Sequence, residues 1–211
     1  MKVNHQIELE RELARIVQTG RRPRLLLHCC CAPCSSYVLE YLNRWLDIDL
    51  FYYNPNIAPQ EEFDHRAAEL RRLAAEMPHE GDFNVIVGSY DAESFAALCK
   101  GHEGDPEGGA RCERCFRMRL GKAVRLAAER GCDYCTTTLT ISPLKDAQLL
   151  NAIGMQLAAG SGVAWLPSDF KKKNGYKRSC ELSEQYGLYR QDYCGCVYSR
   201  LERERQKMSP T

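Results

Sequence analysis

The sequence has no hydrophobic run long enough to cross a membrane, because its longest apolar stretch falls far short of the roughly 20 residues that a bilayer requires. It also lacks the pattern of a signal peptide. Arg21, Arg22 and Arg24 are followed by only three leucines before His28 and a run of cysteines. We therefore expect a soluble, cytoplasmic protein with no membrane partner.

The common signatures of phosphate and acyl-transfer chemistry are also missing. The chain contains no G-x-x-x-x-G-K loop, no G-x-G-x-x-G fingerprint and no G-x-S-x-G elbow. It lacks the C-x-x-x-C-x-x-C spacing of radical S-adenosylmethionine enzymes as well. Charge is nearly balanced, with a net value of +1, so any binding of nucleic acid must depend on a local basic patch.

The composition is that of a globular protein. Of the 211 residues, 44% are hydrophobic and 27% are charged, which excludes a disordered or fibrous chain. Short apolar runs predict strands at residues 25–28, 48–53, 83–87, 134–138 and 163–166, with helical patterns between them and a helix-rich stretch from residue 169 onward. Strands that alternate with helices predict an α/β protein with a mostly parallel sheet flanked by helices.

We expect a single α/β domain over residues 24–207, preceded by an N-terminal helical extension over residues 1–23. Within this extension, residues 4–19 have the pattern of an exposed helix. Leu9, Leu13, Ile16 and Val17 fall on one face of it. This arrangement is typical of an appended helix rather than of a separate domain.

Polar and thiol-bearing segments follow three of the predicted strands. Residues 29–34 form a cysteine run after the first strand, Asn54-Pro55-Asn56 follows the second, and residues 137–142 follow the fourth. Ligands of parallel α/β sheets bind beyond the carboxyl ends of the strands. These three segments are therefore expected to converge on one active-site rim.

The chain contains twelve cysteines, which is a high number for a protein with no sign of export. Seven of them have the short spacings of metal ligands: Cys30, Cys31, Cys34, Cys112, Cys115, Cys194 and Cys196. Zinc sites and iron–sulfur clusters use four thiolates, so seven favour two adjacent metal centres. Neighbouring side chains diverge near a strand end, so the adjacent Cys30 and Cys31 are expected to face different centres. The others are expected to be inert or packed in the core, as is His28: Cys29, Cys99, Cys132, Cys135 and Cys180.

Basic residues concentrate in two places. One group surrounds the second thiol pair: Arg111, Arg114, Arg117, Arg119, Lys122 and Arg125. The other comprises Lys171, Lys172, Lys173, Lys177 and Arg178, interleaved with Phe170 and Tyr176. Each could be an ordinary solvated surface. Their position beside the cysteine motifs favours a phosphate-backbone partner, with Lys171, Lys172, Lys173 and Arg114 contacting phosphates and Tyr176 stacking on a base.

Taken together, the motifs resemble those of the QueH-type epoxyqueuosine reductases over residues 24–202. They are His28-Cys-Cys-Cys-Ala-Pro-Cys34, Tyr53-Asn-Pro-Asn-Ile57, Arg111-Cys-x-x-Cys115, Thr136-Thr-Thr-Leu-x-x-Ser-Pro143, Asp169-Phe-Lys-Lys and Tyr189-Arg-Gln-x-Tyr-Cys-Gly-Cys196. Residues 1–23 and the pair Cys132 and Cys135 are outside the family pattern. Some relatives have aspartate where this chain has Cys34, which suits a metal ligand.

This resemblance implies a fold, an activity and cofactors. The fold is Rossmann-like, similar to the nucleotide α-hydrolase group, whose serine-glycine-glycine phosphate loop is replaced here by Cys-Cys-Cys-Ala-Pro-Cys, so ATP is not expected. The activity is reduction of epoxyqueuosine to queuosine at the wobble position of queuosine-family tRNAs, without cobalamin and with an unidentified electron donor. The cofactors are a [4Fe–4S] cluster and one further metal ion, with iron favoured over zinc.

The resemblance also suggests roles for single residues. We assign Cys30, Cys112, Cys115 and Cys194 to the cluster, and Cys31, Cys34 and Cys196 to the single ion. Asp169, Tyr53 and Tyr193 are candidate proton donors, without an order of preference. Two alternatives remain: a zinc-stabilised RNA-binding module, and a thiol-disulfide oxidoreductase that uses Cys31-Ala-Pro-Cys34 at a helix N-terminus.

Overall fold

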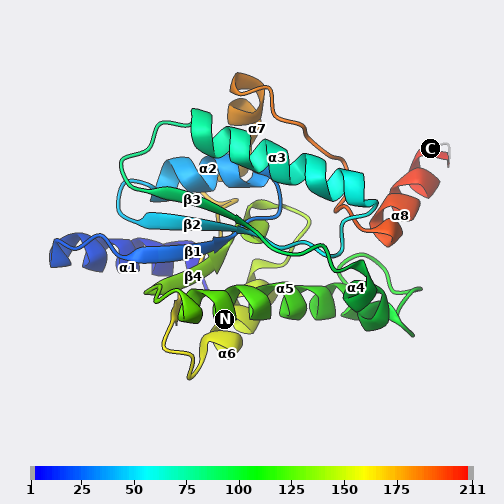
Figure 1. Cartoon of the computed structure of the whole chain (residues 1–211), viewed down its shortest axis with the longest axis horizontal. Helices are drawn as coiled ribbons and strands as arrows, with labels where there is room; N and C mark the ends of the chain where they lie inside the picture. Colours follow the sequence, from blue (N-terminus) through cyan, green and yellow to red (C-terminus); the bar gives the residue numbers. More distant parts are fainter. Residues whose placement is uncertain (1–2, 209–211) are drawn as a thin grey trace.

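The computed structural model describes residues 3–208 and is built around one parallel sheet (Figure 1). Within those residues the strands are β1 (Arg24–His28), β2 (Asp47–Tyr52), β3 (Phe83–Val87), β4 (Tyr134–Thr137) and β5 (Ala164–Trp165). Their order across the sheet is β3-β2-β1-β4-β5, and every neighbouring pair is parallel. This order is that of doubly wound, Rossmann-type sheets. The predicted α/β class is confirmed.

Successive residues of β1 point to opposite faces of the sheet, so each face builds its own core. Leu25 and Leu27 pack with the inner faces of α2 (Ala32–Leu42) and α3 (Gln60–Glu76). Leu26 packs on the other face, with α5 (Ala110–Glu129) and α6 (Ala147–Ala158). The sheet is therefore covered by helices on both sides, as Figure 1 shows.

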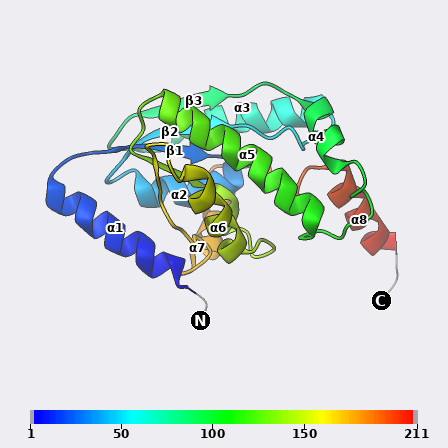
Figure 2. The ribbon, with the colours of Figure 1, turned by 90° about the horizontal axis from the view of Figure 1, so that it is seen from below.

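The remaining elements gather near the ends of these layers. They are α4 (Ala92–Cys99), the 3₁₀ helix η1 (Thr138–Ile141), α7 (Gly175–Gln185) and α8 (Val197–Met208). Helix α7 packs on α2, and α8 lies beside α4 and the first turns of α5 (Figure 2). The predicted helical C-terminal segment is thus confirmed. Within residues 3–208, no helix combines the length and apolar character that crossing a bilayer requires.

The N-terminal helix α1 (His5–Thr19) begins after Asn4, whose side chain accepts a hydrogen bond from the Ile7 amide. Leu9, Leu13 and Ile16 are buried in the same core as β1 and α2, whereas Val17 is 57% exposed. One face of the helix is therefore part of the core, instead of being exposed as the sequence pattern suggested. The proposed division of the chain between residues 23 and 24 stays a prediction.

Candidate metal centre

The three segments that follow β1, β2 and β4 meet at the carboxyl end of the sheet. His28 Nδ1 lies 2.9 Å from Thr137 Oγ1, the Asn54 side-chain amide donates to the Cys29 carbonyl at 3.0 Å, and the Cys30 amide donates to Thr138 Oγ1 at 3.2 Å. The predicted convergence on one rim is confirmed. Burial, reinforced by the positive charge of Arg119, lowers the pKa of His28 to about 3, so this histidine is a neutral core residue.

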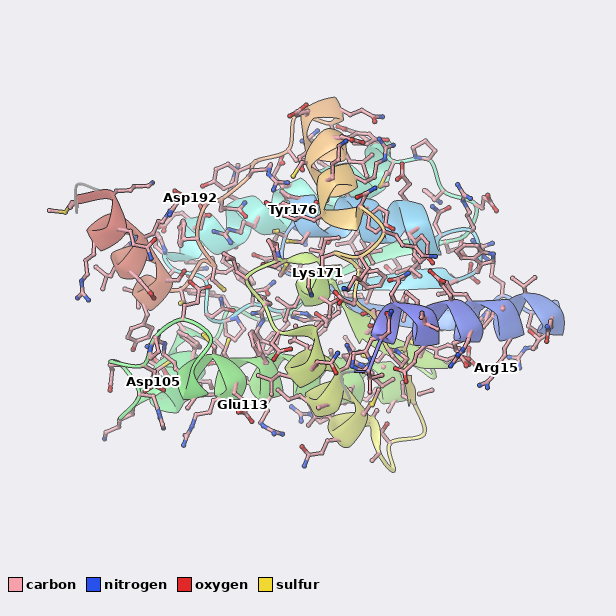
Figure 3. All side chains as sticks on the ribbon, turned by 180° about the vertical axis from the view of Figure 1, so that it is seen from behind. Arg15, Asp105, Glu113, Lys171, Tyr176 and Asp192 are labelled. Carbon is pink, nitrogen blue, oxygen red and sulfur yellow. The ribbon has the colours of Figure 1, made fainter. Side chains whose placement is uncertain are left out.

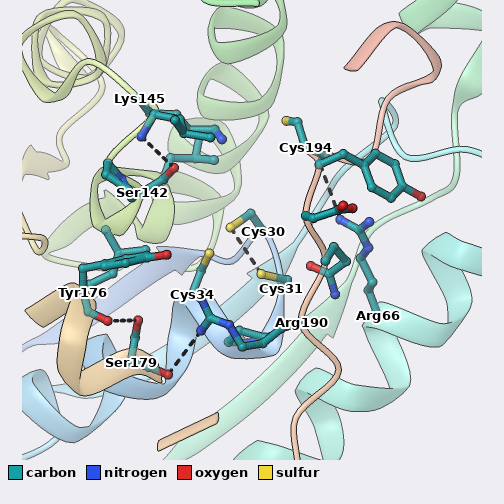
Figure 4. A pocket seen from close by; sticks show the side chains of 18 of the residues that line it. Cys30, Cys31, Cys34, Arg66, Ser142, Lys145, Tyr176, Ser179, Arg190 and Cys194 are labelled. Carbon is teal, nitrogen blue, oxygen red and sulfur yellow. Dashed lines mark hydrogen bonds between the residues drawn. The ribbon is translucent and has the colours of Figure 1, made fainter. Parts of the chain in front are cut away.

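One group of thiols, which we call the trio, consists of Cys30, Cys31 and Cys34. Its three sulfur atoms lie within 4.8 Å of one another, and those of Cys30 and Cys31 are 3.9 Å apart (Figure 4). The expected divergence of the adjacent Cys30 and Cys31 side chains is therefore wrong, while their assignment to different centres stays a prediction. The reason is local: Cys31 is extended and forms the N-cap of α2, and Pro33 in the first turn brings Cys34 back over Cys30.

The pKa shifts within the trio favour one thiolate, on Cys30, that accepts hydrogen bonds from the neutral thiols of Cys31 and Cys34. Hydrogen bonds from Cys31 and Cys34 lower the pKa of Cys30, while the hydrogen bond to Cys30 raises the pKa of Cys31 to about 12. The same contacts raise the pKa of Cys34. The first turn of α2 adds backbone N–H groups and a helix dipole that favour anionic ligands. Three thiols that converge in this way can bind one metal ion from one side.

A second group, the quartet, consists of Cys112, Cys115, Cys194 and Cys196. These four residues line a cavity of about 120 Å³, and Cys115 and Cys196 are buried in one small cluster with Phe95. Burial raises the pKa of Cys115 to about 11 and that of Cys196 to about 12. Backbone amides already donate to two of the sulfurs, from Gly108 to Cys112 at 3.3 Å and from Ser199 to Cys196 at 3.4 Å.

A neighbouring cleft of about 270 Å³ connects the two groups of thiols. The trio lines this cleft, and Cys194, Glu107, Leu144 and Lys145 line both the cleft and the cavity of the quartet. All twelve cysteines are free thiols. The seven predicted ligands are thus brought into two adjacent sets.

Positive side chains surround these thiols. Burial by itself lowers the pKa of Lys145, but Cys194, Cys30 and Cys34 raise it above its ordinary value. Arg66 is 3% exposed and lies with its guanidinium 5.4 Å from the ring centre of Tyr193. Arg119 is 1% exposed beside Cys115. Buried cations need anionic partners. Arg66 already has one in Glu62 at 2.7 Å, so Lys145 and Arg119 are the cations that suit this site to negative charge.

Lys145, Arg66 and Arg119 were not identified as site residues from the sequence. For Lys145 a signal existed, because it follows the Ser142-Pro143 turn in the segment after β4. Arg119 was grouped with the basic residues of α5, and only its spacing of four residues from Cys115 distinguished it. For Arg66 the signal was its spacing on α3, three residues after Phe63 and four before Leu70, which places it on the same buried helix face.

The three candidate proton donors have different surroundings. Tyr193 lines the cleft. Tyr53 is buried in the core on the α5 side, where its ring stacks on Phe51. Asp169 is 8% exposed, and its carboxylate accepts a hydrogen bond from Lys171 at 2.6 Å. Of these three residues, Tyr193 is thus the one in contact with the cleft.

The candidate nucleic-acid contacts are also dispersed. Tyr176 lines the cleft and is 41% exposed, and it lies with Lys171 on the face shown in Figure 3. Lys173 pairs with Glu10, as Lys171 does with Asp169. Lys172 and Arg114 are exposed. These residues stay predicted contacts.

The cysteines expected to pack in the core do so, with one half-buried exception. Cys29, Cys99, Cys132 and Cys135 are buried among hydrophobic side chains, and Cys180 is half-buried. The Cys29 thiol donates to the Leu27 carbonyl at 3.3 Å. Burial raises the pKa of Cys29, Cys99, Cys132 and Cys135, which suits neutral thiols.

Comparison with known proteins adds a family. The model of the family described as epoxyqueuosine reductase QueH matches residues 25–202. A protein of Staphylococcus epidermidis named epoxyqueuosine reductase QueH is 40% identical over 211 residues, which cover 95% of this chain and 86% of that protein. Proteins of the same name from Streptococcus pyogenes (40% identical, 94% and 80% covered) and Thermotoga maritima (34% identical, 85% and 91% covered) are also similar.

Proposed function

The chain belongs to the epoxyqueuosine reductase QueH family, and we propose that it reduces epoxyqueuosine to queuosine at the wobble position of tRNA, in the cytoplasm. The proposed cofactors are a [4Fe–4S] cluster and one further metal ion, iron in preference to zinc. Beside the family match, the observation that carries the proposal is that the cleft lined by the trio adjoins the cavity lined by the quartet, with Cys194 in the wall of both.

We propose that the quartet holds the cluster and that the trio holds the single ion. The donor sets fit these groups. Four thiols surround one cavity, as the four irons of a cluster require, and three sulfurs within 4.8 Å of one another suit a single ion with an open position. This division exchanges Cys30 and Cys196 relative to the sequence-based assignment, because Cys30 lies against Cys31 and Cys196 packs with Cys115.

The proposed reaction is a two-electron deoxygenation. Both C–O bonds of the epoxide break, a C=C double bond forms, and the oxygen takes up two protons and leaves as water. The two electrons come, one at a time, from an external one-electron reductant. When bound, the cluster supplies one-electron transfer and the ion supplies Lewis-acid polarisation of the epoxide oxygen.

The residues of the chain have separate tasks in this proposal. The Lys145 ammonium stabilises negative charge that develops on the epoxide oxygen, because it is a cation in the wall of the cleft. Tyr193 Oη, which lines the cleft, donates one of the two protons that this oxygen takes up, and solvent supplies the other and reprotonates Tyr193. At the rim, the ring of Tyr176 offers a surface on which an unpaired base stacks. Basic residues outside the cleft, Lys172 and Arg114 among them, contact tRNA phosphates.

Anaerobic purification and reconstitution test the proposal. We expect brown protein with visible charge-transfer absorbance, about four irons and four sulfides in the cluster and one further metal ion. With reduced viologen as the electron source, this protein should convert epoxyqueuosine in tRNA to queuosine. Colourless protein with tightly bound zinc and no turnover would instead support an RNA-binding module. Reversible formation of a Cys31–Cys34 disulfide without bound iron would support a thiol-disulfide oxidoreductase.

A further inference from the structure

Arg119 is a charged residue in a position where charge is costly. On α5, the spacing of Cys112, Cys115 and Arg119 places them on one helix face. That face points toward the thiols, and only 1% of Arg119 is exposed. A guanidinium so fully buried requires compensating interactions.

The compensation in the protein itself is incomplete. Arg119 Nη2 donates to Asn54 Oδ1, and Nη1 lies 3.9 Å from Cys115 Sγ. Its Nε has no hydrogen-bond partner within the described part of the chain. Of its two side-chain contacts, the Cys115 thiol is the one that can become anionic. Burial opposes the charge of Arg119, yet Cys115, Cys194 and Cys30 raise its pKa above the ordinary value.

The position of these thiols locates the charge. Arg119 contacts Cys115 of the quartet, and the three thiols of the trio line the same cleft as Arg119, so the guanidinium lies between the two sets. It also lines the cleft that connects them. Because Arg119 is buried, it is excluded as a contact to the tRNA backbone, the role that a basic residue on this helix would otherwise suggest.

Asn54 fixes the orientation of the guanidinium. It is fully buried, its amide group donates to the Cys29 carbonyl at 3.0 Å, and its oxygen is thereby turned toward Arg119. This pair of contacts gives a physical role to the first residue of the Asn54-Pro55-Asn56 turn. A neutral acceptor orients the cation without cancelling its charge.

We propose that Arg119 is a positioning residue that raises the reduction potential of a metal centre held by the quartet. The inference rests on the proposed function. Reduction adds one negative charge to the centre, and a fixed positive charge nearby stabilises the reduced form more than the oxidised form. Hydrogen bonds and charges around the ligand sulfurs are known to set such potentials.

The test compares variants of one helix in anaerobically reconstituted protein. Arg119→Gln removes the charge, Arg119→Lys retains it, and Arg117→Gln is the matched control, since Arg117 is exposed on the same helix and pairs with Glu113. The midpoint potential is measured by redox titration followed by absorbance and electron paramagnetic resonance, together with iron and sulfide content.

We expect Arg119→Gln to shift the equilibrium toward the oxidised centre at least tenfold, which is about 59 mV for one electron. Arg119→Lys should retain most of the wild-type potential, and Arg117→Gln all of it. A wild-type potential in Arg119→Gln, or an equally large shift in Arg119→Lys, would overturn the proposal, because charge would then not be the cause.

If Arg119→Gln loses its iron, its midpoint potential cannot be measured, and a second variant, Asn54→Asp, then tests the inference. Asn54→Asp keeps Arg119 and sets a carboxylate against its guanidinium, so it should lower the potential in the same direction, and an unchanged potential would contradict the inference. A wild-type protein that forms no reducible centre would refute the proposed function itself. A reducible centre whose midpoint potential is unchanged by substitutions of Arg119 and Asn54 would refute this inference and leave the proposed function intact.

Discussion

At the scale of the residue, Cys34 separates the two thiol sets most sharply. It lies in the first turn of α2, within 4.8 Å of the sulfurs of Cys30 and Cys31. We expect Cys34→Ala to lose the single ion and the reductase activity while the absorbance of the cluster remains. Cys34→Asp should retain the ion and part of the activity, because a carboxylate oxygen is a competent ligand for iron or zinc.

Metal analysis and visible spectra of the reconstituted variants measure this difference. Cys180→Ser is the control, because Cys180 lies on α7 outside both thiol sets, and it should match the wild type in iron, sulfide and turnover. Destruction of the cluster in Cys34→Ala would show that Cys34 binds the cluster and that our division of the seven thiols is wrong.

Single residues also show what could and could not be predicted from the sequence at the metal site. The seven candidate ligands follow from their spacing, because a C-x-x-C turn can aim two sulfurs at one point whatever the rest of the fold does. Their grouping does not follow from spacing. Cys196 packs with Cys115 only because α8 returns to the start of α5 (Figure 2). Likewise, a buried arginine such as Arg119 cannot be distinguished from an exposed one on the same helix until its partners across space are known.

At the scale of the element, α1 differs most from its sequence-based prediction, because one face of this expected appendage is buried in the main core. We expect Leu9→Ala to reduce the free energy of unfolding by about 2–5 kcal/mol, because Leu9 is fully buried in the main core and its truncation leaves a cavity. Ile7→Ala on the same helix is the matched control, since Ile7 is 44% exposed, and its cost should stay within about 0.5 kcal/mol. Urea denaturation followed by circular dichroism measures both.

Equal, small effects of the two substitutions would mean that α1 is an appendage, as its sequence suggested. The sequence was ambiguous here for a physical reason. An amphipathic pattern states that one face of a helix must be covered, but not by what. The strand segments were easier to predict, because short apolar runs between turn residues have few alternatives. β3 (Phe83–Val87) has the predicted bounds, and β2 (Asp47–Tyr52) begins and ends one residue early.

The order of the strands shows a different limit of local sequence. Alternation of strands and helices predicts parallel pairing, yet nothing in a single segment states that β4 pairs with β1. That pairing joins Leu25 to Tyr134, residues far apart in the chain. It decides the site, because it brings Thr137 and Thr138 to His28 and Cys30. The predicted convergence depended on the general rule for parallel sheets and not on the local pattern.

At the scale of the whole molecule, charge is nearly balanced at +1, so the proposed binding of tRNA would have to come from a few unpaired lysines and arginines. The run Lys171-Lys172-Lys173 is not uniform in this respect. Lys171 pairs with Asp169 and Lys173 with Glu10, whereas Lys172 is exposed and has no salt bridge in residues 3–208. A lysine that must first break a salt bridge to a carboxylate contributes less net free energy to binding a phosphate than an unpaired lysine does.

We therefore expect Lys172→Ala to flatten the dependence of tRNA affinity on salt by about one unit of slope, and Lys173→Ala to flatten it less. Filter binding at a series of salt concentrations measures both slopes, with Arg15→Ala on α1 as a control that keeps the wild-type slope and with iron content unchanged in all variants. An unchanged slope in Lys172→Ala would make Lys172 an ordinary solvated residue. If Lys173→Ala instead had the larger effect, the pairing with Glu10 would have to break on binding, and α1 would then be next to the bound tRNA.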